Sequence, residues 1–111
     1  MAKTNEFVQH VIEMMEDFGA VSARAMFGGY GIYHVGLMFG LVADDELYLK
    51  VDATNEPRFV AEDLGPFMYV KNGKSMPMSY FRAPEASLDS RDVMTEWATL
   101  GYEAALRAKK K

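Results

Sequence analysis

Hydrophobic residues recur every three or four positions near both ends of the chain, which is the spacing of one face of an α-helix. The first stretch predicts a helix from Thr4 or Asn5 to Phe18, closed by Gly19. A short helix is predicted over residues 54–64, with a proline in its first turn. The last stretch predicts a long helix that runs into the basic end of the chain and is capped by one of three residues: Ser87, Asp89 or Ser90.

Between these helices the hydrophobic period changes to two, which is typical of strands with one buried face. Strands are predicted over residues 21–27, 30–34, 37–43, 46–52, 66–70 and 76–82. Asp44-Asp45 and Asn72-Gly73 are read as tight hairpin turns. Pro77 cannot donate a ladder hydrogen bond, so its strand is expected at a sheet edge or with an irregular start.

The predicted order of elements is α-ββββ-α-ββ-α, which defines an α+β fold. An antiparallel sheet of about five to six strands, with three helices packed against one face, accounts for this order because each strand has one apolar face to cover. No linker or repeat divides the sequence, so residues 1–111 are expected to form a single domain.

The composition limits the classes of chemistry. Without cysteine, disulfides, thiol nucleophiles and cysteine-bound metals are excluded. No apolar run approaches the roughly 20 residues that span a bilayer, and no signal peptide is evident, so a cytoplasmic location is expected. The net charge is −4 although the last five residues carry four basic side chains, and so acidic a body makes direct nucleic-acid binding unexpected.

No catalytic or metal-binding constellation is recognisable. His10 and His34 are far apart in the sequence and have no partner at ligand spacing, and Asp44-Asp45-Glu46 is better read as a charged turn than as a calcium loop. The chain is therefore predicted to be no enzyme and to need no cofactor or metal.

The most distinctive stretch runs from Arg24 to Lys50 and contains Gly28-Gly29-Tyr30-Gly31. These glycines could present backbone N–H groups to an anion, but their spacing matches no known phosphate loop, and bends within a sheet are the simpler interpretation. Alternation leaves open a cationic, phenol-lined surface on the side of the sheet without helices, formed by Arg24, Tyr48, Lys50 and Arg82.

Several strings resemble the N-terminal domain of the TfoX/Sxy competence regulators: RAMFGGYGIY from Arg24, GLMFGLV from Gly36, LYLKVD from Leu47, Met78-Ser79-Tyr80 and Pro84-Glu85. The likeness covers essentially the whole chain. It implies a compact α+β unit that regulates genes for DNA uptake alongside the cyclic-AMP receptor protein. The motif positions carried over as candidate binding residues are Arg24, Phe27, Gly28, Gly29, Tyr30, Gly31, Tyr48, Lys50 and Tyr80.

Two functional hypotheses follow. The first is a non-catalytic regulatory domain, a co-regulator of transcription and competence that works through protein contacts. The alternative is a small-ligand or anion-binding module that uses the glycine turn with Arg24 and Lys50. The full regulators of this family carry a second, C-terminal domain, so this chain resembles a stand-alone version, and the strand with Met76 and Met78 is a candidate contact for a homodimer.

Overall fold

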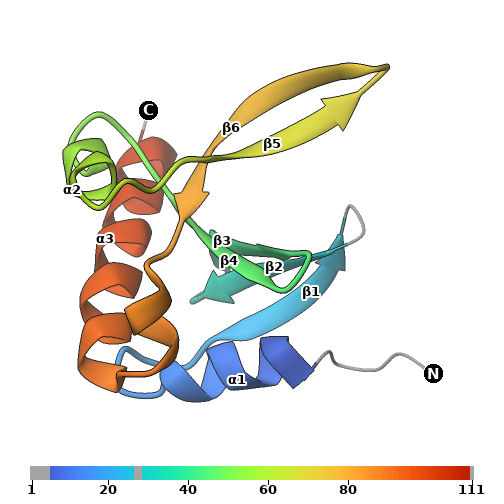
Figure 1. Ribbon diagram of the computed structural model, residues 1–111. Coiled ribbons are helices and arrows are strands. Elements are labelled where there is room, and N and C mark those ends of the chain that lie inside the picture. The colour runs from blue at the N-terminus through green and yellow to red at the C-terminus, as the bar shows by residue number, and fades with distance from the viewer. Residues whose placement is uncertain (1–5, 27–28, 111) are drawn as a thin grey trace.

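The fold is known from a computed structural model that describes residues 6–26 and 29–110, apart from the side chains of residues 69–71 and 75–77 (Figure 1). Along the chain lie α1 (Glu6–Met14), β1 (Ser22–Met26), β2 (Gly29–His34), β3 (Leu37–Ala43), β4 (Glu46–Lys50), α2 (Glu56–Ala61), β5 (Pro66–Lys71), β6 (Lys74–Arg82), the 3-10 turn η1 (Glu85–Leu88) and α3 (Arg91–Lys109). The predicted α+β class and the order α-ββββ-α-ββ-α are confirmed.

The helix boundaries differ from the sequence prediction. α1 ends at Met14, and the chain continues to Gly19 in turns closed by hydrogen bonds to the carbonyl oxygen of Met15. α2 covers only six residues, and its first turn contains the expected proline. Of the three predicted caps for α3, Ser90 serves, because its side chain accepts a hydrogen bond from the N–H of Val93 at 3.3 Å.

The sheet is antiparallel throughout, with strand order β1-β2-β3-β4-β6-β5. β6 therefore lies between β4 and β5, and the expectation that it is the edge strand is wrong as a description of the whole strand. β4 pairs with β6 only at the three positions Tyr80–Arg82, so the earlier part of β6, including Pro77, pairs with β5 alone. The missing N–H of Pro77 therefore leaves no gap in the ladder with β4.

The part of the β5–β6 hairpin that precedes Tyr80 in β6 projects from the body of the sheet, and we call it the arm (Figure 1). The true edge strands are β1 and β5. The homodimer contact through the strand with Met76 and Met78 stays a prediction, because this part of β6 pairs with β5 on one side only and its other side has no strand partner among the described residues.

All three helices pack on one face of the sheet and form a single core with it. The core consists of α1 residues such as Val11, strand residues such as Ile32 and Leu49, and α3 residues such as Met94. α2 joins it through Phe59, whose ring lies 4.9 Å from that of Trp97. Helices on one face were predicted, and the structure confirms them (Figure 1).

Gly101 allows α3 to approach the sheet closely. A Cβ atom at this position would lie 3.1 Å from the Cβ of Leu49 and 3.3 Å from the carbonyl oxygen of Phe39. A larger residue would push the helix off β3 and β4, so the small residue in the apolar stripe of α3 fixes the spacing between helix and sheet.

Candidate functional site

The face of the sheet opposite the core gathers aromatic, methionine and cationic side chains. The strand registers pair Tyr33 with Met38, Leu41 with Tyr48, Tyr48 with Arg82, and Lys50 with Tyr80. Directly opposed residues of neighbouring strands share a face. We call this surface the outer face; its members are Arg24, Met26, Gly29, Gly31, Tyr33, Met38, Leu41, Tyr48, Lys50, Tyr80 and Arg82.

Two cation–π contacts organise the outer face. The guanidinium of Arg24 lies 5.2 Å from the ring centroid of Tyr33, and the ammonium of Lys50 lies 5.2 Å from that of Tyr80. Lys50 Nζ also donates a hydrogen bond of 2.8 Å to Ser79 Oγ. The two cations are thus held in place by neighbours that leave their charge uncompensated.

The phenols of Tyr48 and Tyr80 on this face remain hydrogen-bond donors at neutral pH. Burial, helped by the nearby phenol of Tyr33, raises the pKa of Tyr80 above its usual value. Burial and the Glu46 carboxylate likewise raise the pKa of Tyr48, whose ring packs 5.0 Å from that of Phe67 at the base of the arm. Each phenol therefore presents an O–H group beside an apolar surface.

The arginines divide into paired and unpaired groups. Arg82, which the sequence placed on this surface, forms a 3.0 Å ion pair with Glu46. Three other arginines also pair with carboxylates: Arg58, Arg91 and Arg107. Among the described residues, Arg24 and Lys50 form no ion pair with a carboxylate.

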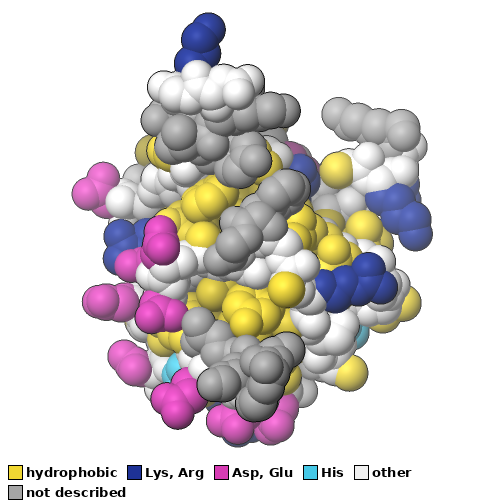
Figure 2. All heavy atoms as spheres, turned by 90° about the vertical axis from the view of Figure 1, so that its right-hand side faces the viewer, with side chains coloured by type: hydrophobic (Ala, Val, Ile, Leu, Met, Phe, Trp, Pro, Cys, Tyr) yellow, Lys and Arg dark blue, Asp and Glu magenta, His cyan; other side chains and the backbone are white. Residues whose placement is uncertain are grey.

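The space-filling view shows the side of the molecule on which the arm projects (Figure 2). Hydrophobic side chains lie open in the middle of this side, while Lys and Arg lie toward its margins and Asp and Glu gather at its lower left. The acidic character of the chain is therefore not spread evenly over its surface.

The glycine string has a packing role in the described residues. Phe27 and Gly28 lie outside the described residues, whereas Gly29 and Gly31 lie inside β2 and pair with Met26 and Arg24 of β1. A Cβ at Gly29 would lie 2.1 Å from the carbonyl oxygen of Val42. A Cβ at Gly31 would lie 2.7 Å from Met26 Sδ. Neither position admits a side chain without displacing its neighbours.

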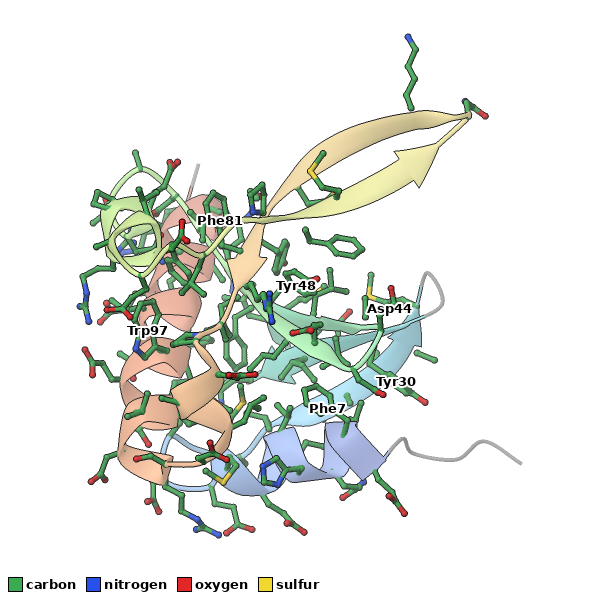
Figure 3. All side chains as sticks on the ribbon, viewed as in Figure 1. Phe7, Tyr30, Asp44, Tyr48, Phe81 and Trp97 are labelled. Carbon is green, nitrogen blue, oxygen red and sulfur yellow. The ribbon has the colours of Figure 1, made fainter. Side chains whose placement is uncertain are left out.

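Tyr30 is separated from the other candidate residues. It pairs with Ala25 and Val42 and packs against the core on the helix side of the sheet. Figure 3 shows Tyr30 near α1, whereas Tyr48 lies on the side of the sheet that faces the arm. Of the nine predicted positions, the structure places six together on the outer face: Arg24, Gly29, Gly31, Tyr48, Lys50 and Tyr80.

The histidines make structural contacts. His10 Nε2 donates a 2.7 Å hydrogen bond to the carbonyl oxygen of Leu88, which ties α1 to η1. His34 Nδ1 donates a 2.7 Å hydrogen bond to the carbonyl oxygen of Ala20, and its ring packs 4.8 Å from that of Phe18. Within the described residues, no group of three or more His, Asp or Glu side chains is placed to hold a metal ion.

Sequence reasoning missed a group of hydrogen-bonded polar side chains at the end of β4, next to Lys50. We call this group the polar junction. Asn55 is 2 % exposed, and its Nδ2 donates to the carbonyl oxygens of Lys50 and Leu100 at 3.1 and 3.0 Å. Asp52 accepts hydrogen bonds from Arg107 Nε and Nη2 at 2.5 and 2.9 Å. The Asp that ends the LYLKVD string was a signal for this junction, but its partner Arg107 is too far along the sequence to infer.

Residues 13–105 match the TfoX N-terminal domain. The chain belongs to this family. It is 26% identical over 97 residues to protein Sxy of Escherichia coli (strain K12), an alignment that covers 87% of this chain and 46% of Sxy. It is 32% identical over 79 residues to DNA transformation protein TfoX1 of Aliivibrio fischeri (strain ATCC 700601 / ES114), which covers 69% of this chain and 37% of that protein.

The chain thus spans less than half the length of these two curated relatives. In this TfoX N-terminal domain, the described residues of the RAMFGGYGIY string lie in β1 and β2, and LYLK lies in β4. The described part of the chain contains no helix of the length and apolarity that a bilayer crossing requires.

Proposed function

We propose that the chain is a non-catalytic regulatory domain that acts through protein contacts made by its outer face. The composition of that face supports the proposal. Tyr, Met and Arg are enriched at protein interfaces, and here they surround Leu41, which is buried at the middle of the face. The two unpaired cations, Arg24 and Lys50, favour a partner that presents carboxylates beside an apolar patch.

The family relationship indicates which partners to test. One relative is named as a DNA transformation protein, and the resemblance to competence regulators implies the cyclic-AMP receptor protein and other transcription machinery. We therefore propose that this domain contributes to the regulation of genes for DNA uptake by binding such a protein.

The proposal is tested by binding of the immobilised chain to purified cyclic-AMP receptor protein and to RNA polymerase. Tyr48→Ala removes an aromatic anchor and is expected to weaken binding about tenfold or more. Arg24→Ala removes an exposed cation without disturbing the core and is expected to weaken binding about fivefold, mainly through the association rate.

The matched control is Glu103→Ala, an exposed substitution on α3 that leaves the outer face intact. It is expected to bind as the unmodified chain does. Thermal unfolding of each variant separates loss of contact from loss of fold. No binding to either partner, or equal losses in the control and the outer-face variants, would contradict the proposal.

A further inference from the structure

A shallow pocket of about 330 Å³ lies at one margin of the outer face, where the last turns of α3 pass the ends of β3, β4 and β6. It is lined by Leu37, Met38, Lys50, Tyr80, Ala105, Ala108 and Lys109. Its volume is within the range of small-molecule sites. The two alanines leave the space open, because a longer side chain at either position would project into it.

The lining has one apolar part and one cationic part. Leu37, Met38 and the two alanines supply carbon and sulfur surface. Lys50 and Lys109 supply ammonium groups, and neither forms an ion pair with a carboxylate among the described residues.

These unpaired ammonium groups contrast with the arginines of this chain. Carboxylates outnumber basic side chains, and four of the five arginines have found a carboxylate partner. Lys50 is instead oriented by Ser79 Oγ at 2.8 Å and by the ring of Tyr80. An oriented cation beside an apolar pocket suits a ligand in which an anionic group is attached to an apolar body.

We propose that this pocket binds a small organic anion, with its carboxylate or phosphate group at Lys50 and its apolar body against Met38 and the alanines of α3. Lys109 adds a second positive charge at the rim, and it also offsets the negative end of the α3 dipole. The Tyr80 phenol stays protonated, because burial raises its pKa, and therefore offers an O–H donor to the same anionic group.

This inference goes beyond the regulatory role, since a small anion needs no protein partner to bind. The proposed anion site also consists of other residues than the glycine turn that the sequence suggested. Of the residues first considered for an anion site, only Lys50 lines the pocket, together with Tyr80 from the family motif.

The experiment is a titration of the ¹⁵N-labelled chain followed by amide shifts in NMR. The probes are benzoate and phenyl phosphate, with benzyl alcohol as the neutral analogue and inorganic phosphate as the anion without an apolar body. We expect saturable shifts at millimolar benzoate or phenyl phosphate that map to residues 37–38, 50, 80 and 105–109. Benzyl alcohol and inorganic phosphate should bind much more weakly, and the stronger of the two aromatic anions identifies the preferred head group.

Two variants test the geometry. Lys50→Met keeps the apolar stem and removes the charge, and it should weaken the better probe about fivefold or more. Ala108→Leu fills the pocket from the exposed side of α3 and should abolish saturable binding. Lys74→Met is the matched control, because Lys74 is an exposed lysine at the start of β6 and does not line the pocket.

Amide spectra and thermal unfolding establish that each variant is folded. Absence of saturable shifts with both aromatic anions would overturn the inference, as would shifts that map elsewhere, equal binding of benzyl alcohol, or equal effects of Lys50→Met and Lys74→Met. If these results occur while the protein partner still binds the outer face, the pocket proposal fails alone. If the anions bind and no protein partner does, the regulatory proposal fails alone.

Discussion

At the scale of single residues, the turn between β2 and β3 contains a conformational conflict. Val35 has φ of +53° and is 82% exposed, and the following Gly36 has φ of +75°. Two-residue turns of this kind favour Asn, Asp or Gly at the first position, as at Asn72-Gly73 in the arm. A β-branched side chain is disfavoured in the left-handed region, so Val35 costs stability without burying its side chain in return.

Replacing Val35 by Asn is expected to raise the free energy of unfolding by about 1 kcal/mol, because Asn tolerates positive φ. Urea denaturation of both proteins measures the change. Val60→Asn is the control, since Val60 is also an exposed valine but lies in α2 with helical geometry. A loss of stability in Val35→Asn, or an equal gain in the control, would show that the turn is not strained.

Asp52 gives stability a dependence on acid pH. The hydrogen bond from Arg107 is the main cause that lowers the pKa of Asp52 to about 2 from its usual 3.8. A lowered pKa in the folded state stabilises the fold above the unfolded pKa, and this contribution is lost as the pH falls from about 4 through 2.

Asp52→Asn is therefore expected to lower the free energy of unfolding at neutral pH by about 1 kcal/mol, a figure reduced for solvent screening of this partly exposed pair. It should also flatten the decline in stability between about pH 4 and pH 2. Urea denaturation across this pH range checks both effects. An unchanged pH profile in the variant would mean that other carboxylates account for the acid sensitivity.

At the scale of elements, Asn55 joins the end of β4 and the residues that follow it to α3, which is far away in the sequence. Its side chain bonds the end of β4 through the Lys50 carbonyl, α3 through the Leu100 carbonyl, and the N–H of Asp52 at 2.8 Å. The helix-start prediction identified the residue but not this role. Fully satisfied buried amides of this kind hold elements in one arrangement.

Asn55→Ala is expected to destabilise the fold by about 2 kcal/mol, because two carbonyls and one N–H each lose their hydrogen bond to the buried Asn55 side chain. The pocket should also bind its probe more weakly, since Lys50 is no longer fixed at its carbonyl. Thr54→Ala is the neighbouring control, because Thr54 is exposed and only its backbone N–H is bonded. Equal unfolding midpoints for the two variants would disprove the role assigned to Asn55.

At the scale of the whole molecule, the distribution of charge argues against direct binding of duplex DNA. The net charge is −4, four of five arginines are engaged in ion pairs, and the outer face holds only two unpaired cations. Phosphate contacts by many free basic residues are what make nonspecific DNA affinity strong and salt-dependent.

We therefore expect no retardation of a short DNA duplex by this chain alone in a low-salt gel assay. Addition of a DNA-binding partner should produce the only shifted species. Retardation by the isolated chain that disappears with added salt would contradict this expectation and would redirect attention to the basic C-terminal residues. The same assay with Lys50→Met would then show whether the outer face takes part.

The order and type of the elements could be predicted from the sequence because they depend on local spacing. Helical stripes, strand alternation and the Asp44-Asp45 and Asn72-Gly73 turns are all encoded within a few residues. Lys50 and Arg24 were also predicted to share one side of the sheet, since alternation assigns each to a face. The early ends of α1 and α2 were not predictable, because tertiary packing decides where a short helix stops.

The sequence alone was sufficient for the α+β class, the family and the absence of any recognisable catalytic motif. Only the tertiary structure decided that β6 inserts beside β4, that Tyr30 faces the core, and that Lys50 meets the end of α3 in a pocket. These features depend on strand order and on contacts between residues far apart in the chain. Local periodicity states which side of a strand a residue occupies, but long-range packing determines which other residues it meets there.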